Sequence, residues 1–267
     1  MDFDSVEVLN LDRMIGATRL DAAIGRYKVD VAARLMSSAA TAKSFAVARH
    51  KASITDPEGL SAALDYDVIF SCVDRPWPRA VLNAIAYSDL IPVIDGGIAL
   101  DTFADGHLRG GIWRAHTLVP GRPCMVCLGQ LDLGELSLDR LGFLDDPKYI
   151  QTSGRDAPAR QNVAMLSASV SAALLAQFVS LVAHPGGRGV PAPLRYMLAP
   201  HTLEHSPATS GEFCPYEAEL ALGDRRTPLT DPGIKHRTIS ARNRRRPVTL
   251  LALALLETFL NKAIARL

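Results

Sequence analysis

The run of residues from 67 to 95 constrains the fold of this chain more than any other stretch. Asp67–Asp74 is a continuous apolar segment of strand length that ends in a carboxylate. Such a run is typical of a central parallel strand that is buried on both faces. A helix is predicted over Arg79–Ala86, and a second buried strand over Pro92–Asp95 is expected to end at Gly96-Gly97. This alternation predicts an α/β fold with helices layered on a parallel sheet.

Two positions after these strands are candidate ligand contacts. Asp74 ends the first strand and Gly96 follows the second, so both are expected at the carboxyl edge of the sheet. Open α/β sheets bind ligands at this edge. The structural alternative for Asp74 is that it only caps the next turn or helix. Cys72 lies among apolar residues of the same strand and is expected in the core.

Further helices and strands are predicted outside residues 67–95. Apolar spacing predicts a helix over Lys28–Met36, and Pro57 is expected to begin another helix. Further predictions are a short strand at Ser44–His50, a hairpin of Phe103–Leu108 against Gly111–Leu118, a core helix over 159–183 that is uncharged from Gln161 onward, and a strand at Leu194–Ala199. The hairpin would extend the parallel sheet with antiparallel strands.

The first residues of the chain are typical of the end of a strand in a nucleotide-binding unit. In a dinucleotide-binding βαβ unit, an acidic residue at the end of the second strand reaches the ribose hydroxyls. Asp2 would be that residue, so the first strand, the glycine-rich turn and the first helix are expected before it. Asn10 has two interpretations, a hydrogen bond within a turn and a phosphate contact, whereas Asp4 is expected to be structural.

Composition argues against several classes of partner. The 267 residues carry a net charge of +1, which gives no general argument for nucleic-acid or membrane binding. The acidic start Met-Asp-Phe-Asp is unlike a signal peptide, so a cytoplasmic protein is expected. In a reducing compartment, the Cys-x-x-Cys pair of Cys124 and Cys127 indicates a metal or redox site.

Five motifs in a fixed order carry a family resemblance over roughly residues 2–220. They are Asp-x-Asp-x-Val-Glu-x-x-Asn-Leu-x-Arg at 2–13, Ile-Gly-x-x-Lys-Val at 24–29, Cys-Val-Asp…Arg at 72–79, Pro-x-Ile-x-Gly-Gly at 92–97 and Pro-Gly-x-x-Cys-x-x-Cys at 120–127. Together they resemble the ThiF/MoeB/HesA superfamily, which includes the ubiquitin-activating enzymes. The resemblance implies an incomplete Rossmann-like three-layer α/β fold that lacks its N-terminal glycine-rich βαβ portion. Its expected parts are a mostly parallel sheet, an antiparallel extension, a zinc-site loop region and a C-terminal helix.

The resemblance also implies an activity. This family uses ATP and Mg²⁺ to adenylate the C-terminal glycine carboxylate of a ubiquitin-like or sulfur-carrier protein. By this resemblance Asp2 holds the ribose, Arg13 and Lys28 neutralise the triphosphate, and Asp74 lies beside Mg²⁺ and the phosphates. Attack on the α-phosphorus builds charge on phosphate oxygens, which fixed cations and a metal stabilise. Without the family, Arg13 and Lys28 are explained equally well as solvated surface charges.

Cys124 and Cys127 resemble the first half of the family's Cys-x-x-Cys…Cys-x-x-Cys zinc site. Cys214 is placed to be a third ligand, and structural Zn²⁺ takes four. With these three cysteines at the metal and Cys72 in the core, none remains for a thioester or persulfide link. This favours adenylation alone, or chemistry completed by another protein.

The fourth zinc ligand is not identified by the sequence. Position 211 is Gly and position 217 is Glu, where a second Cys-x-x-Cys pair would place a cysteine. His201 or His205 could substitute, and a metal-free pair of thiols is the alternative.

The domain prediction is one adenylation domain over residues 1–225, in which 120–220 holds the cysteine site and the crossover region. Residues 226–267 are expected to form a basic linker followed by an apolar helix. This pattern favours packing on the body or on a second subunit over contact with anionic lipid. Because the family is generally dimeric, we expect a homodimer.

Two alternatives to the adenylation activity stay open. A truncated, catalytically inactive relative would bind a partner or zinc without turning over ATP. An NAD(P)-dependent oxidoreductase would share the sheet layout, but the zinc-type cysteines and the Asn-Leu-x-Arg motif argue against it.

Overall fold

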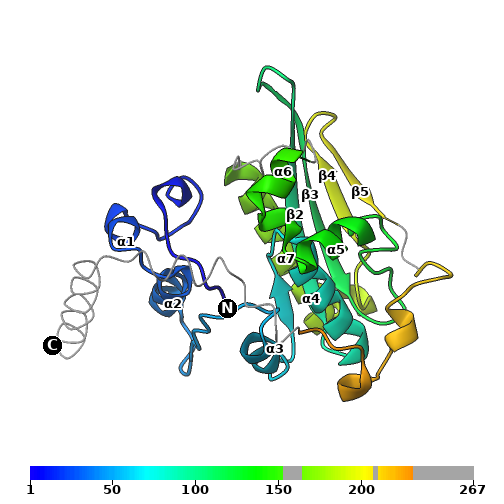
Figure 1. Ribbon diagram of the computed structural model, residues 1–267. Helices are drawn as coiled ribbons and strands as arrows, with labels where there is room; N and C mark the ends of the chain where they lie inside the picture. Colours follow the sequence, from blue (N-terminus) through cyan, green and yellow to red (C-terminus); the bar gives the residue numbers. More distant parts are fainter. Residues whose placement is uncertain (153–163, 207–209, 231–267) are drawn as a thin grey trace. The chain divides into compact units, whose positions relative to one another are not determined.

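A computed structural model describes residues 1–152, 164–206 and 210–230. The chain forms two compact units, one containing Met1–Gly59 and the other Leu60–Asp231, and each is described by itself (Figure 1). Helix α3 (Pro57–Ala63) begins at the predicted proline and carries the chain from one unit to the other. The predicted C-terminal helix lies outside the described residues, so the domain boundary at residue 225 stays a prediction.

The first unit is built from short helices. They are η1 (Val8–Asn10), α1 (Arg19–Ala23) and α2 (Lys28–Ala39). Helix α2 confirms the prediction over Lys28–Met36 and continues for three further residues. The predicted strand at Ser44–His50 is wrong, since this segment pairs with no strand in the described chain. Most of its residues are exposed, so it has no apolar face to bury against a neighbour.

A buried carboxylate joins α1 to α2. Asp21 is 1% exposed and forms ion pairs of 2.7 Å with Arg26 and with Arg34. Thr18 and Asp21 also cap α1 reciprocally, each backbone N–H donating to the other's side chain. Burial alone would raise the pKa of Asp21, but the hydrogen bonds from Arg34 and Thr18 outweigh it and hold this pKa well below its usual range. The carboxylate is therefore ionised at neutral pH.

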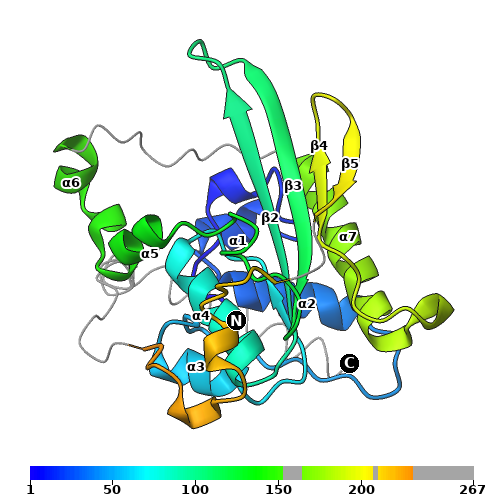
Figure 2. The ribbon, with the colours of Figure 1, turned by 90° about the vertical axis from the view of Figure 1, so that its right-hand side faces the viewer.

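The second unit contains a mixed five-stranded sheet (Figures 1 and 2). Its strands lie in chain order: β1 (Ile69–Ser71), β2 (Val93–Thr102), β3 (Leu108–Leu118), β4 (Leu194–Met197) and β5 (Thr202–His205). β1 and β2 are parallel, and the other three neighbouring pairs are antiparallel. The α/β class is confirmed, but the described sheet has one parallel pair where a mostly parallel sheet was predicted. The strand at 194–199 is confirmed in position.

Strands β2 and β3 form a long hairpin (Figure 2). The predicted strand end at Gly96-Gly97 is wrong, because β2 continues through both glycines to Thr102. Gly96 pairs with Ala115, and a Cβ at position 96 would lie 2.6 Å from Leu174 Cδ1. Glycine at this position lets a helix approach the sheet closely instead of ending the strand. The predicted strand Phe103–Leu108 is mostly the turn of this hairpin.

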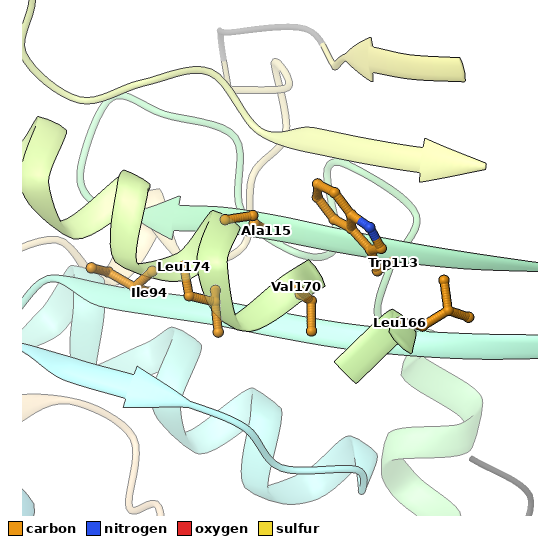
Figure 3. Packing of buried hydrophobic residues seen from close by; sticks show 7 residues of the cluster. Ile94, Trp113, Ala115, Leu166, Val170 and Leu174 are labelled. Atoms are coloured by element: carbon orange, nitrogen blue, oxygen red, sulfur yellow. The ribbon is translucent and has the colours of Figure 1, made fainter. Parts of the chain in front are cut away.

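Helices cover both faces of the sheet. The helical elements of this unit after α3 are α4 (Pro76–Ser88), α5 (Leu133–Arg140), η2 (Phe143–Asp145), α6 (Pro147–Thr152), α7 (Ala164–Ala183), η3 (Pro185–Gly187), η4 (Glu217–Glu219) and η5 (Gly223–Arg225). Helix α7 packs on Ile94 and Trp113 (Figure 3). Arg79 of α4 lies 4.0 Å from Asp95, whose side chain points to the face opposite that of Ile94. The expected three-layer arrangement is thus present in this unit.

Among the described helices, α7 alone is long and apolar enough to cross a membrane. It buries Leu166, Val170 and Leu174 against the sheet, which fits the core helix predicted over 159–183 (Figure 3). Residues 159–163 of that prediction lie outside the described residues. Its other side exposes Leu175 and Val179, so the sheet covers only one face of this helix.

Leu174→Ala tests this packing. The substitution removes the side chain that lies over Gly96, and we expect the free energy of unfolding to fall by about 3 kcal/mol because a cavity is left. The matched control is Leu175→Ala, since Leu175 is 59% exposed and should lose less than about 1 kcal/mol. Urea unfolding followed by tryptophan fluorescence measures both. Equal losses would contradict the packing of α7 on β2.

Candidate functional site

Asp74 lies at the carboxyl edge of the parallel strand pair. Strand β1 ends at Ser71, residues 72–74 leave the sheet, and α4 begins at Pro76. The Asp74 side chain is exposed, and it is not the cap of α4, whose N-cap residue is Arg75. The predicted position of Asp74 at this edge is confirmed. Gly96 directly follows Asp95, the last β2 residue that pairs with β1, but β2 itself does not end there.

The helix after Asp74 is capped from a distant part of the chain. Asp139 of α5 accepts a hydrogen bond of 2.8 Å from the backbone N–H of Trp77 in the first turn of α4. The same carboxylate binds the guanidinium of Arg75, which also donates to Asp145 at 2.9 and 3.0 Å. Burial alone would lower the pKa of Arg75, but the bonds to Asp139 and Asp145 raise it. This clamp, defined as Arg75, Asp139 and Asp145, fixes the residue next to Asp74, and the motifs gave no sign of it.

A buried charge cluster lies beneath the same edge. Asp95 is fully buried and accepts a hydrogen bond of 2.6 Å from Ser71 Oγ. Arg79 and Arg114 lie 4.0 and 3.6 Å from its carboxylate. Arg79 also donates to the carbonyl of Val73 at 3.0 Å. Burial lowers the pKa of Arg114, and the neighbouring Arg79 lowers it further. The hydrogen bond from Arg79 to Val73 connects this cluster to the loop that contains Asp74 and fixes the start of that loop.

Cys72 lies in that loop and is exposed, so the prediction that it belongs to the core is wrong. The strand ends at Ser71, one residue before it, and the burial that the apolar run suggested does not continue past the strand. Phe70 is also 43% exposed, and β1 is the edge strand of the described sheet.

Two of the predicted nucleotide contacts lie together in the first unit. Asp2 Oδ1 accepts a hydrogen bond of 2.7 Å from the Asp4 N–H, and burial raises the pKa of Asp2. Lys28 Nζ lies 2.9 Å from Asp4 Oδ2 and also acts on Asp2 electrostatically. The structure thus brings Asp2, Asp4 and Lys28 together. Asp4, which is expected to be structural, forms an ion pair with Lys28.

Asn10 and Arg13 make local contacts in the same unit. Asn10 Oδ1 accepts the Glu7 N–H at 2.9 Å, which is the turn interpretation of this residue. Arg13 donates to the carbonyl of Leu9 at 2.7 Å and to Asp12 at 3.0 Å. Asp74 belongs to the second unit, so the predicted contacts are divided between the two units. The roles of these side chains toward a nucleotide stay predictions.

The three predicted metal ligands come together in the second unit. The sulfur atoms of Cys124, Cys127 and Cys214 all lie within 4.8 Å of one another. The first two are 3.4 Å apart, and the Cys127 N–H donates to Cys124 Sγ at 3.3 Å. The N–H of Gly211 donates to Cys127 Sγ, also at 3.3 Å. Burial raises the pKa of Cys124, whereas at Cys127 the hydrogen bonds from Gly211 and Cys124 outweigh burial and lower the pKa.

This sulfur cluster fits Zn²⁺ in donor type, but the described residues supply three ligands to it. Three thiols, of which Cys124 and Cys127 accept backbone N–H donors at sulfur, match a zinc–thiolate site. His201 shares a hydrogen bond of 3.0 Å with Tyr196, and neither His201 nor His205 joins the cluster. Glu217 accepts from the Gly121 N–H and the Ser210 hydroxyl at 2.8 and 3.0 Å. The structure therefore supports none of the suggested substitutes as the fourth ligand.

One buried tyrosine ties the cysteine segments to α4. The hydroxyl of Tyr87 donates to the carbonyl of Arg122 at 2.6 Å, and the Ser210 hydroxyl donates to the same carbonyl at 2.8 Å. The Tyr87 ring centroid lies 6.0 Å from that of Tyr216. Burial raises the pKa of Tyr216 to about 12. Both segments that carry the cysteines are thus anchored on the same helix residue.

Solved structures of MccB share this fold. MccB from E. coli with ATP gives a TM-score of 0.57 at 17% identity, covering 80% of this chain and 56% of that one. E. coli MccB alone gives 0.56 at 16%, with 88% and 60% covered. The Microcin C7 biosynthetic enzyme MccB in complex with N-formylated MccA gives 0.59 at 16%, with 81% and 58% covered. At these identities the likeness establishes the fold, and this chain spans less than two thirds of the MccB chains.

The fold is therefore an α/β fold of the kind found in MccB. The sequence matches the ThiF family over residues 1–187, and the chain belongs to that family. This confirms the resemblance carried by the ordered motifs. A comparison with curated proteins finds no significant match.

Asp139→Ala tests the clamp beside Asp74. The substitution leaves the Trp77 N–H and the Arg75 guanidinium without their shared acceptor, and we expect about 2 kcal/mol of lost stability. The control is Asp145→Ala, which removes the more exposed partner of the same arginine and should cost less than about 1 kcal/mol. Chemical unfolding compares the variants, and a larger loss for Asp145→Ala would contradict the assignment.

Proposed function

We propose that this chain uses ATP and Mg²⁺ to adenylate the C-terminal glycine carboxylate of a ubiquitin-like or sulfur-carrier protein. Membership of the ThiF family supports the reaction class, and it favours adenylation over hydride transfer with NAD(P). The observation that carries the proposal is the exposed Asp74 at the carboxyl edge of the parallel strands, where α/β folds bind ligands.

The proposed step is an in-line displacement at the α-phosphorus of ATP. A carboxylate oxygen of the carrier forms the new bond to phosphorus, and the bond to pyrophosphate breaks. Asp74 offers oxygen ligands, which Mg²⁺ prefers. Lys28 and Arg13 would neutralise phosphate charge, Asp2 would accept hydrogen bonds from the ribose, and Asn10 would contact phosphate. Lys28 would then exchange its present partner Asp4 for a phosphate.

A homodimer in the cytoplasm remains part of the proposal. The exposed apolar residues of α7, which include Leu175, Val179 and Val182, support a contact with a second copy of the chain. The near-neutral net charge of +1 fits a protein partner better than nucleic acid.

ATP–pyrophosphate exchange by the full chain tests the reaction. We expect exchange that depends on a carrier protein with a C-terminal glycine, and a loss of about 100-fold in Asp74→Asn, which removes the charge but keeps the shape. Asp101→Asn is the control, because Asp101 is an exposed carboxylate on the hairpin, and it should keep the exchange rate.

Three outcomes of this assay separate the alternatives. Unchanged exchange in Asp74→Asn would contradict the role of Asp74. Exchange with MccA and with no carrier protein would move the substrate class toward the ligand named in the MccB complex. Carrier binding without any exchange would leave a non-catalytic binding protein.

We also propose that Cys124, Cys127 and Cys214 hold one Zn²⁺ as a structural centre. The convergence of the three sulfur atoms supports this assignment. Metal analysis of the purified full chain should find about one Zn²⁺ per chain, and Cys214→Ser should lose most of it. The control is Cys72→Ser, an exposed cysteine in the loop after β1, which should keep its zinc. Equal zinc in both variants, or none in the parent chain, would refute the centre.

A further inference from the structure

The structure shows which of two positions lies next to the cysteine cluster, where a fourth protein ligand would be needed. A second Cys-x-x-Cys pair around Cys214 would place its other cysteine at position 211 or 217. A Cβ at Gly211 would lie 3.4 Å from Cys127 Sγ, and the Gly211 N–H already donates to that sulfur. Glu217 instead accepts hydrogen bonds from Gly121 and Ser210 at Oε1, and its carboxylate is not part of the sulfur cluster. Position 211 therefore faces the metal site, and its glycine offers no side-chain donor.

The side of the cluster next to Gly211 is open to solvent. Cys124 and Cys214 are buried and Cys127 is half-buried, whereas Gly211 and Glu212 are exposed and Phe213 is 89% exposed. A zinc ion with three protein ligands keeps its fourth position for water or another small molecule. A thiolate is a suitable replacement, because thiolates are preferred ligands of this metal.

We propose that the metal centre has three thiolate ligands and an open fourth position beside Gly211, which takes a small exogenous thiol. The thiol would bind through sulfur as a thiolate, release its proton to solvent and take the position that a water molecule would otherwise hold. This inference rests on the proposed zinc centre and is independent of adenylation. It gives the centre a property beyond a structural role, because a ligand from solution can enter its coordination sphere.

Gly211→Cys is the decisive variant. Its φ does not lie in the left-handed region, and the nearest atoms to a new Cβ belong to Cys127, so a cysteine can be placed there without backbone strain. We expect it to complete the site and to bind Zn²⁺ at least about 10-fold more tightly than the parent chain, measured by competition with a chelator. Gly211→Ala is the matched control, since it adds the Cβ without a ligand, and its affinity should stay near that of the parent.

Spectroscopy of the Co²⁺-loaded full chain reads the ligands directly. On addition of β-mercaptoethanol, the sulfur-to-cobalt charge-transfer band of the parent should rise by roughly one third, because three thiolates become four. Gly211→Ala should respond in the same way. Gly211→Cys should begin at the higher intensity and should not respond. A parent chain that keeps its cobalt but does not respond would overturn the open position.

Glu217→Gln tests the remaining explanation, in which the Glu217 carboxylate is the fourth ligand of the metal. If Glu217 closed the site, the cobalt bands of this variant would change, whereas an open site at Gly211 predicts the parent spectrum. A parent chain that takes up neither Co²⁺ nor Zn²⁺ would overturn both the centre and its open position. ATP–pyrophosphate exchange is measured separately, so failure of adenylation with an intact thiol response would leave this inference standing.

Discussion

The backbone ladder between β2 and β3 is the interaction on which the second unit depends. It pairs residues from Val93 to Thr102 with residues from Leu118 back to Leu108. β1 joins one side of this hairpin and β4 joins the other. Successive side chains alternate between the faces, so Ile94 meets α7 while Asp95 meets the arginines on the opposite face. A slip of one residue would exchange these two environments, which makes the register costly to change.

The elements next to the carboxyl edge of the sheet could be predicted from the sequence where the residues that determine them lie close together in the chain. The apolar run over 67–74 predicted β1, which is shorter and covers Ile69–Ser71. The helix predicted over Arg79–Ala86 is confirmed within α4, which begins three residues earlier, at Pro76. The prediction that the strand ends at Gly96 is wrong because glycine is typical both of a chain turn and of a close approach between elements. Only its contact with Leu174, far away in the sequence, decides between them.

In the candidate site, too, features that depend on nearby residues could be predicted, whereas contacts between distant parts of the chain could not. Motif spacing was enough to select the three cysteines that converge in space. It could not distinguish position 211 from 217, because both keep the same spacing to Cys214 and only the folded chain shows which one faces the sulfurs. The cap that Asp139 supplies to α4 also escaped the sequence, since the two partners are 62 residues apart and no pattern links them. The sequence leaves two interpretations of Asn10, and the structure gives it a bond within its own turn.

The anchoring of Tyr87 has a thermodynamic consequence for the cysteine cluster. One carbonyl, that of Arg122, accepts hydrogen bonds from α4 and from the segment that carries Cys214. These hydrogen bonds join the two cysteine segments directly. A metal ion entering such a preorganised site does not have to order the chain, so more of its intrinsic binding energy appears as affinity. For the same reason, removing the metal should leave the surrounding segments folded, unlike a zinc finger, in which binding and folding are one event.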